Sequence, residues 1–152
     1  SRLIYKNSLA MNKKQKVIFI CTGNSCRSQM AEGFLRNIAG NLLDVYSAGS
    51  NPSKIHPNAI SVMKELNIDI SEHTSDSIDC YSNIGMNIVI TVCDNANQVC
   101  PNFPGEVQRT HWSIPDPFRV WKANKADLNN FRQTRDIIKD HINQFMKNLE
   151  KK

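Results

Sequence analysis

The sequence lacks any apolar run long enough to span a membrane, and it has no signal-peptide pattern. Its four histidines are scattered, without the CxxC or HExxH spacing of a zinc site. No internal repeat, low-complexity tract or linker divides its 152 residues, a length that suits one domain with a buried core. We therefore expect a single cytoplasmic domain over residues 11–152. Residues 1–10, which precede Met11, are expected to be a lead outside the fold.

Charge and cysteine content narrow the function classes further. The chain has 19 Lys and Arg against 14 Asp and Glu, giving a net charge of +5. Much of this excess lies near the two ends, so it suits an anionic substrate but does not argue for nucleic acid. Five cysteines are present. Their odd number favours functional thiols in a reducing compartment over a disulfide scaffold.

Hydrophobic patterning predicts alternating strands and helices. Short apolar runs typical of strands occupy residues 16–20, 42–47, 87–92 and 107–112. Helical patterns cover residues 27–39, a stretch around 59–66, and residues 126–149, whereas the polar segment 94–98 is expected to be a loop. The first helix is expected to turn Met30, Phe34, Leu35 and Ile38 inward. This order predicts an α/β fold of three layers, with a central, mostly parallel four-stranded sheet flanked by helices.

The loop between the first strand and the first helix carries a thiol and a guanidinium six positions apart, Cys21 and Arg27. Inward-turned N–H groups and a helix N-terminus hold an oxyanion in such a loop, and the same field favours a thiolate. Arg27 is suited to grip two oxygens of the anion. Within the loop, Gly23 permits close backbone approach and unusual dihedral angles, and Asn24 tolerates left-handed geometry. The alternative is a buried cysteine with an unrelated surface arginine.

The loop, together with a second segment, resembles a known family. The string CTGNSCRS resembles the phosphate loop of the low-molecular-weight protein tyrosine phosphatases, a resemblance that covers the chain from Met11 onward. The segment 91–101, with Cys93 and Cys100, is similar to that of the thioredoxin-coupled arsenate reductases within this superfamily. The resemblance implies a phosphatase-like fold and an oxyanion-binding loop made by Thr22, Gly23, Asn24, Ser25, Cys26, Arg27 and Ser28.

The resemblance also implies a relay of three thiols. Cys21 would attack arsenate, Cys93 would attack the Cys21 sulfur to release arsenite, and Cys100 would attack Cys93. Cys21 and Cys93 both follow strands of one parallel sheet, so their residues should share its carboxyl edge. Thioredoxin would reduce the final disulfide, and no tightly bound cofactor is expected. Phosphate or sulfate would compete with arsenate. The alternatives are that Cys93 and Cys100 are a buried residue and a loop residue without a role, or that the chain is a phosphatase that uses a phosphocysteine.

The remaining candidates surround the loop. Asp116, between two prolines, resembles the general acid of the superfamily, although Phe118 stands where tyrosine phosphatases usually carry tyrosine. Ser28 is expected to cap the first helix or to direct its hydroxyl to the thiolate. Cys26 is interpreted as a loop-shaping residue, and Cys80 as a bystander or core residue. The resemblance also implies a monovalent cation, K⁺, at Asn24, Glu32, Ser47 and Asp76, and we expect a monomer.

Overall fold

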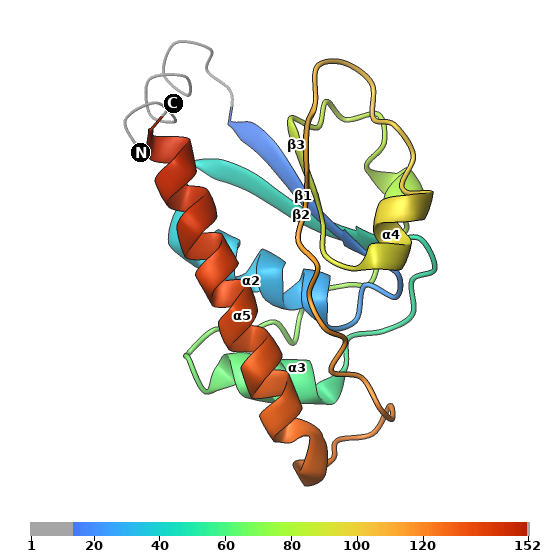
Figure 1. The fold of residues 1–152 in the computed structure, drawn as a ribbon, viewed down its shortest axis with the longest axis vertical. Coiled ribbons are helices and arrows are strands. Elements are labelled where there is room, and N and C mark those ends of the chain that lie inside the picture. Colours follow the sequence, from blue (N-terminus) through green and yellow to red (C-terminus); the bar gives the residue numbers. More distant parts are fainter. Residues whose placement is uncertain (1–13, 152) are drawn as a thin grey trace.

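Four parallel strands form one sheet in the order β2-β1-β3-β4 in the computed structural model, which describes residues 14–151 (Figure 1). The strands are β1 (Gln15–Cys21), β2 (Leu43–Gly49), β3 (Ile88–Thr91) and β4 (Gln108–His111). All three pairings are parallel, so the expected sheet is confirmed and is wholly rather than mostly parallel. Cys21 lies opposite Gly49, and Thr91 pairs with Ile20. The expected lead, residues 1–10, lies outside the described residues.

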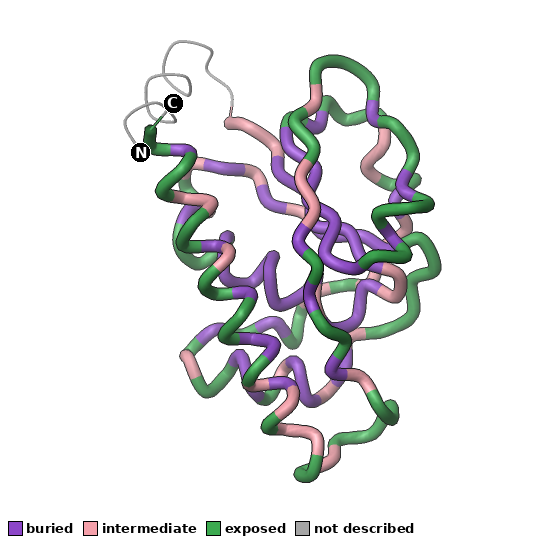
Figure 2. Tube along the Cα trace, viewed as in Figure 1, coloured by how far each residue is buried: buried purple, intermediate pink, exposed green. Residues whose placement is uncertain are grey.

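The two central strands are buried because both of their faces are covered. All four residues of β3 are buried, as are the last five of β1, from Val17 to Cys21 (Figure 2). Continuous apolar runs of this kind are typical of parallel strands with layers on both sides. The carboxyl ends of β1 and β3 therefore emerge together from the middle of the core. This arrangement confirms that Cys21, the last residue of β1, and Cys93, two residues past β3, belong to one edge of the sheet.

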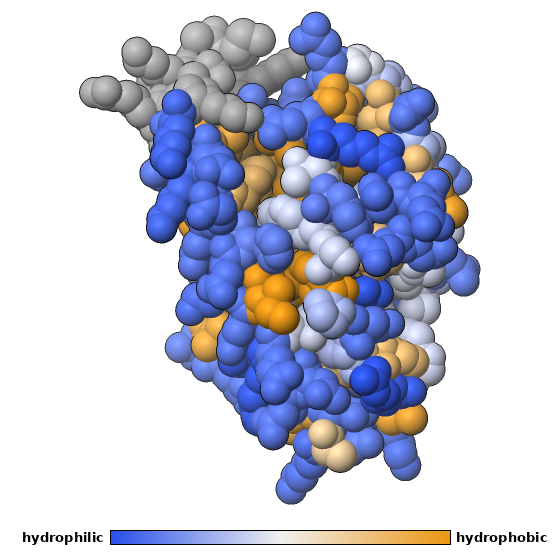
Figure 3. All heavy atoms as spheres, in the orientation of Figure 1, coloured by the Kyte–Doolittle hydropathy of each residue, from blue (hydrophilic) through white to orange (hydrophobic). Residues whose placement is uncertain are grey.

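The helices are distributed unequally about the sheet. They are α2 (Arg27–Ala39), α3 (Pro57–Lys64), α4 (Asp94–Val99) and α5 (Lys125–Glu150), with a 3-10 turn at Ile78–Cys80. Helices α2, α3 and α5 pack on one another, whereas α4 contacts β1 and β3. In Figure 1 the strands lie between α5 and α4. The outer surface of α5 is largely hydrophilic in Figure 3. No helix within residues 14–151 is long and apolar enough to cross a membrane.

Two expectations about local structure were wrong. Residues 94–98 form most of helix α4 rather than a loop, because Cys93 caps the helix: its sulfur accepts the N–H of Ala96 at 3.4 Å. Ile38 is 46% exposed, because the inner side of α2 ends in Ala39, which is fully buried. The buried line on α2 therefore runs through Ala31, Leu35 and Ala39 and leaves Ile38 at its margin.

Candidate active site

The backbone of the loop between β1 and α2 is held by the segment that follows β2. The carbonyls of Thr22, Gly23 and Ser25 accept the N–H groups of residues 51, 53 and 56, at 2.8–3.0 Å. In a trans peptide the N–H points away from the C=O. The next N–H groups along the chain therefore point away from residues 51–56, and that of Asn24 donates to the Cys21 sulfur. Backbone N–H groups that turn inward in this way are the donors that an oxyanion requires.

The sulfur of Cys21 receives a defined hydrogen-bond environment. The backbone N–H of Asn24 donates to it at 3.2 Å, and the Ser28 hydroxyl oxygen lies 2.9 Å away. Because the Asn24 side-chain amide donates to this hydroxyl at 2.8 Å, the proton of Ser28 remains for the sulfur. Ser28 is therefore the thiol-directed hydroxyl and not the cap of α2, whose N-cap residue is Cys26.

Asn24 is the central brace of the loop. Its φ of 49° is in the left-handed region, as expected for an asparagine that supports a turn. Its side-chain oxygen accepts the N–H of Asp76 at 2.9 Å, and its carbonyl accepts the hydroxyl of Ser75 and the amide of Gln29. Sequence reasoning assigned no bracing role to Ser75 or Gln29, because both contacts join the loop to side chains outside it.

The glycine that the loop needs for close approach is Gly49. A Cβ there would lie 2.5 Å from the Thr22 carbonyl oxygen and 3.0 Å from the Asn24 nitrogen. At Gly23, by contrast, the nearest atoms would be 3.4 Å away, and its φ is not positive. The expectation of unusual dihedral angles at Gly23 was therefore wrong. The signal for Gly49 was available in the Ala-Gly-Ser that ends β2, but only the pairing with β1 shows its purpose.

Arg27 and Asp116 meet at the mouth of the loop. An Arg27 nitrogen lies 3.6 Å from a carboxylate oxygen of Asp116, and another donates to the Ile114 carbonyl at 2.9 Å. Asp116 is held in turn by the N–H of Phe118 at 2.9 Å. These residues enclose a cavity of about 200 Å³, which is lined by Cys21, Thr22, Gly23, Ser25, Cys26, Arg27, Ser53, Asp116, Phe118 and Trp121.

Cys93 stands beside this cavity. Its sulfur lies 3.4 Å from the Thr22 hydroxyl, which also accepts a hydrogen bond from the Asn95 amide at 3.1 Å. The hydroxyl proton of Thr22 is therefore available to the sulfur of Cys93. A second hollow, of about 570 Å³, is lined by Cys93 and shares Thr22, Arg27 and Asp116 with the first. The two thiols thus face adjoining hollows that meet at these three residues.

The other three cysteines occupy distinct environments. Cys100 is the C-cap residue of α4, and burial raises the pKa of its thiol, an effect that nearby Arg109 partly offsets. Burial raises the pKa of Cys26 to about 12, which agrees with a loop-shaping role. Cys80 is exposed, so it is not a core residue. All five thiols are free.

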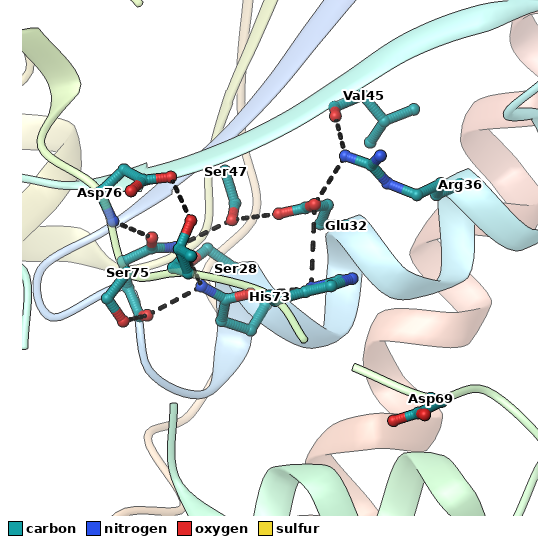
Figure 4. Close-up of polar contacts among 12 residues, drawn as sticks. Ser28, Glu32, Arg36, Val45, Ser47, Asp69, His73, Ser75 and Asp76 are labelled. Carbon is teal, nitrogen blue, oxygen red and sulfur yellow. Dashed lines mark hydrogen bonds and ion pairs between the residues drawn. The ribbon is translucent and has the colours of Figure 1, made fainter. Parts of the chain in front are cut away.

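The four residues of the expected cation site lie close together: Asn24 contacts Ser47 and Asp76, and Figure 4 shows Ser47 beside Glu32. Ser47 donates to one oxygen of Glu32, and Arg36 donates to the other at 2.7 Å. The Asn24 oxygen is engaged by the N–H of Asp76, and an Asp76 carboxylate oxygen accepts from Thr74 and Tyr81. Arg36 therefore supplies the positive charge that Glu32 requires. The cation at these four residues stays a prediction.

His73 is the titratable group that lies beside this cluster. His73 lies with its Nδ1 3.8 Å from Glu32, and burial lowers the pKa of its imidazole. Among the described residues, no group of three or more His, Cys, Asp and Glu side chains is placed to hold a metal ion.

A buried cysteine that accepts a backbone N–H of its loop, at the carboxyl edge of a parallel sheet and beside an Arg–Asp pair, is the arrangement expected of a phosphatase-like thiol enzyme. The profile of the low molecular weight phosphotyrosine protein phosphatases matches residues 16–152, and the chain belongs to this family.

Within the family, the chain is similar to arsenate reductases. Arsenate reductase 1 of Staphylococcus epidermidis is 47% identical over 133 residues, which cover 88% of this chain and 96% of that protein. A solved arsenate reductase in the phosphate binding state is 33% identical, with a TM-score of 0.71, over 88% of this chain and 98% of that one. The thioredoxin-dependent arsenate reductase of Corynebacterium glutamicum is 25% identical, with a TM-score of 0.71. The match covers 97% of this chain and 69% of that one.

Proposed function

We propose that the protein reduces arsenate to arsenite with three thiols, Cys21, Cys93 and Cys100. The observation that carries this proposal is the 3.4 Å contact between the Cys93 sulfur and the hydroxyl of Thr22, the residue next to the nucleophile. A phosphatase needs no second thiol at this place, whereas a two-electron reduction needs one. The high identity to proteins named arsenate reductase agrees with this assignment.

The first step is the attack of the Cys21 thiolate on arsenic. The anion is held by the N–H groups of the loop and by Arg27, which would exchange part of its contact with Asp116 for substrate oxygens. A sulfur–arsenic bond forms and an arsenic–oxygen bond breaks. Asp116 protonates the departing oxygen, which leaves as water. Arsenic remains in its oxidised state in this adduct.

The second step transfers the electrons. The Cys93 thiolate attacks the sulfur of Cys21, a sulfur–sulfur bond forms, and the sulfur–arsenic bond breaks with its electron pair passing to arsenic. Arsenite leaves, and the two thiols have supplied two electrons. The Thr22 hydroxyl, oriented by Asn95, is placed to stabilise the attacking sulfur.

The third step moves the disulfide out of the cavity. The Cys100 thiolate attacks Cys93, which releases Cys21 as a thiolate and leaves a Cys93–Cys100 disulfide. A dithiol reductant then returns both sulfurs to thiols and becomes a disulfide itself. We propose thioredoxin for this role, in line with the thioredoxin-dependent relative from Corynebacterium glutamicum.

The experiment that tests this function is arsenate-dependent NADPH oxidation coupled through thioredoxin reductase and thioredoxin. The wild-type protein should turn over, and Cys93→Ser and Cys100→Ser should not. Cys80→Ser is the matched control, because this thiol is exposed and lies in the 3-10 turn outside the site. Full turnover without Cys93 or Cys100 would refute the relay.

A second activity is favoured by the aromatic side of the cavity. Phe118 and Trp121 pack edge to face, with ring centroids 4.7 Å apart, and both line the hollow above Cys21. A flat aryl phosphate would fit against them. We therefore expect weak hydrolysis of aryl phosphates through a phosphocysteine, dependent on Cys21 and Asp116 but not on Cys93.

Potassium, compartment and oligomeric state stay predictions. A K⁺ ion at the cluster beneath the loop would share the Glu32 carboxylate with Arg36, and no step above uses one. Titration of the protein with KCl against NaCl, followed by thermal unfolding, tests for a specific effect. We propose that the protein is a monomer in the cytoplasm, where thioredoxin could reduce it. Sedimentation measures its oligomeric state.

A further inference from the structure

The two thiols of the final disulfide stand at opposite ends of α4. Cys93 is its N-cap residue and Cys100 its C-cap residue, whose N–H donates to the carbonyl of Ala96. Cys100 is seven positions after Cys93, and a helix rises about 1.5 Å per residue, so their Cα atoms are roughly 10 Å apart. A disulfide requires about 4.4–6.8 Å between Cα atoms. The helix must therefore unwind before Cys100 can reach Cys93.

The C-terminal end of α4 is held by Arg109 from β4. Its guanidinium donates to the carbonyl of Asn97 at 3.0 Å and to the carbonyl of Cys100 at 3.4 Å. The last carbonyls of a helix have no partner within the helix itself. Arg109 thus supplies donors to two carbonyls at the C-terminal end of α4. One of them belongs to Cys100, the residue whose thiol has to move.

The N-terminal end of α4 is held two residues further along the same strand. His111 Nε2 lies 2.8 Å from Asp94, the first residue of the helix, and its Nδ1 lies 2.7 Å from the Thr91 hydroxyl. Thr91 in turn donates to the side chain of Asn97 at 3.1 Å. The hydrogen bond from His111 lowers the pKa of Asp94, as a contact made by the carboxylate form should.

We propose that Arg109 and His111 act as a clasp that keeps α4 folded and so gates the transfer of the disulfide from Cys21–Cys93 to Cys93–Cys100. This inference rests on the proposed function and adds two positioning residues to it. Neither residue touches the reacting sulfur atoms. Both residues act through α4, the helix that lies between the two thiols.

The clasp requires the Cys21–Cys93 disulfide to form before the Cys93–Cys100 disulfide. While Cys93 is a free thiol, its sulfur accepts the N–H of Ala96 and completes the helix cap. Bonding of that sulfur to Cys21 draws it toward the loop and removes it from the cap. With its cap lost, α4 depends more on its contacts with the sheet, among them Arg109 and His111. Unwinding of the segment then brings the Cys100 thiolate to Cys93. The early disulfide therefore loosens the segment that must move next.

The test does not require arsenate. In a Cys21→Ser background, diamide oxidises Cys93 and Cys100 to their disulfide, accepting the two electrons and two protons, and alkylation with peptide mapping follows the reaction. Arg109→Gln should form this disulfide about tenfold faster, because the two charge-assisted hydrogen bonds from the guanidinium to α4 are lost. Arg109→Lys keeps the charge near Cys100 but lacks the two-pronged guanidinium, so it should be faster as well. Arg132→Gln, on α5, is the matched control and should leave the rate unchanged.

Hydrogen exchange gives a second readout that involves no thiol chemistry. Amide protons of residues 96–100, at the end of α4, should exchange about tenfold faster in Arg109→Gln and in His111→Gln. Exchange in the strands of the sheet should be unchanged. Unchanged or slower disulfide formation together with unchanged exchange would overturn the clasp. If NADPH-coupled turnover is absent while α4 loosens as expected, the proposed function fails and the clasp stands.

Discussion

The hydroxyl oxygen of Ser28 lies 2.9 Å from the sulfur of Cys21, and the Asn24 amide donates to the same hydroxyl. The Asn24 amide also donates to the Ser47 hydroxyl at 3.0 Å, which fixes its orientation toward Ser28. The Cys21 sulfur is therefore oriented from the first turn of α2 as well as from the loop.

Removal of this hydroxyl should slow the attack on arsenic. Ser28→Ala is expected to lower kcat/KM for arsenate about tenfold, the effect of one hydrogen bond to a charged sulfur. Stopped-flow measurement of the first disulfide separates this step from recycling. Ser82→Ala, which removes an exposed hydroxyl from a loop away from the site, is the control. Equal rates in the two variants would remove Ser28 from the mechanism.

Gly49→Ala should distort the loop. The added Cβ would lie 2.5 Å from the backbone oxygen of Thr22, and backbone cannot yield as a flexible side chain does. We expect a loss of about 1–3 kcal/mol in the free energy of unfolding, as for other overpacked sites, with weaker phosphate binding. Urea denaturation and phosphate titration measure the two effects. Gly23→Ala, with nearest atoms at 3.4 Å, should be milder, and the reverse order would contradict this account.

The thiols should differ in their reaction with iodoacetamide. Cys80 is exposed and should be alkylated in the folded protein, whereas Cys26 is buried with a pKa raised to about 12 and should not react until unfolding. Timed alkylation with peptide mapping checks the order. Labelling of Cys26 at the rate of Cys80 would show that the loop opens freely.

Glu65 should make stability depend on pH in acid. Its hydrogen bonds with Arg132, and then with Arg135, lower its pKa from 4.5 to about 2. Because the folded-state pKa is the lower one, this stabilisation is present above pH 4.5 and is lost as the pH falls toward 2. Glu65→Gln should cost about 1 kcal/mol at neutral pH, since the ion pairs are partly exposed, and nothing near pH 2. Urea denaturation at both pH values tests this, and a constant difference would contradict it.

Arg36→Gln should leave Glu32 without its positive partner. The Glu32 side chain is only 10% exposed, so its carboxylate depends on the Arg36 ion pair at 2.7 Å. We expect a loss of about 1–3 kcal/mol in the free energy of unfolding, the cost of an underpaired buried acceptor. If K⁺ but not Na⁺ restores this stability in the variant, the cluster can accept the cation once Arg36 is gone. Wild-type stability in the variant would show that Arg36 is not the partner.

The sequence was sufficient for the features that follow from strand and loop chemistry. Apolar runs identified all four strands to within one or two residues, and the parallel sheet then placed Cys21 and Cys93 at one edge. The loop residues were predictable because a thiol, an asparagine and an arginine at this spacing serve one purpose. Their positions are confirmed by the geometry, while their roles in arsenate reduction stay predictions.

The parts that sequence reasoning missed depend on contacts between distant segments. Helix α4 has a polar sequence typical of a loop, and it is stabilised by Cys93 as its cap and by Arg109 and His111 from β4. Gly49 is required by a carbonyl 27 positions earlier in the chain, at Thr22. Local propensity carries no information on such partners, so only the assembled sheet shows them.

The loop takes its shape from main-chain bonds to residues 51, 53 and 56. Contacts of this kind constrain the path of that segment but not the identity of most of its side chains. The rim of the cavity, where Lys54 lies over the ring of Trp121, can therefore vary while the nucleophile keeps its geometry. In evolutionary terms, substrate choice and bond chemistry are separable here: a new preference can arise at the rim without rebuilding the loop.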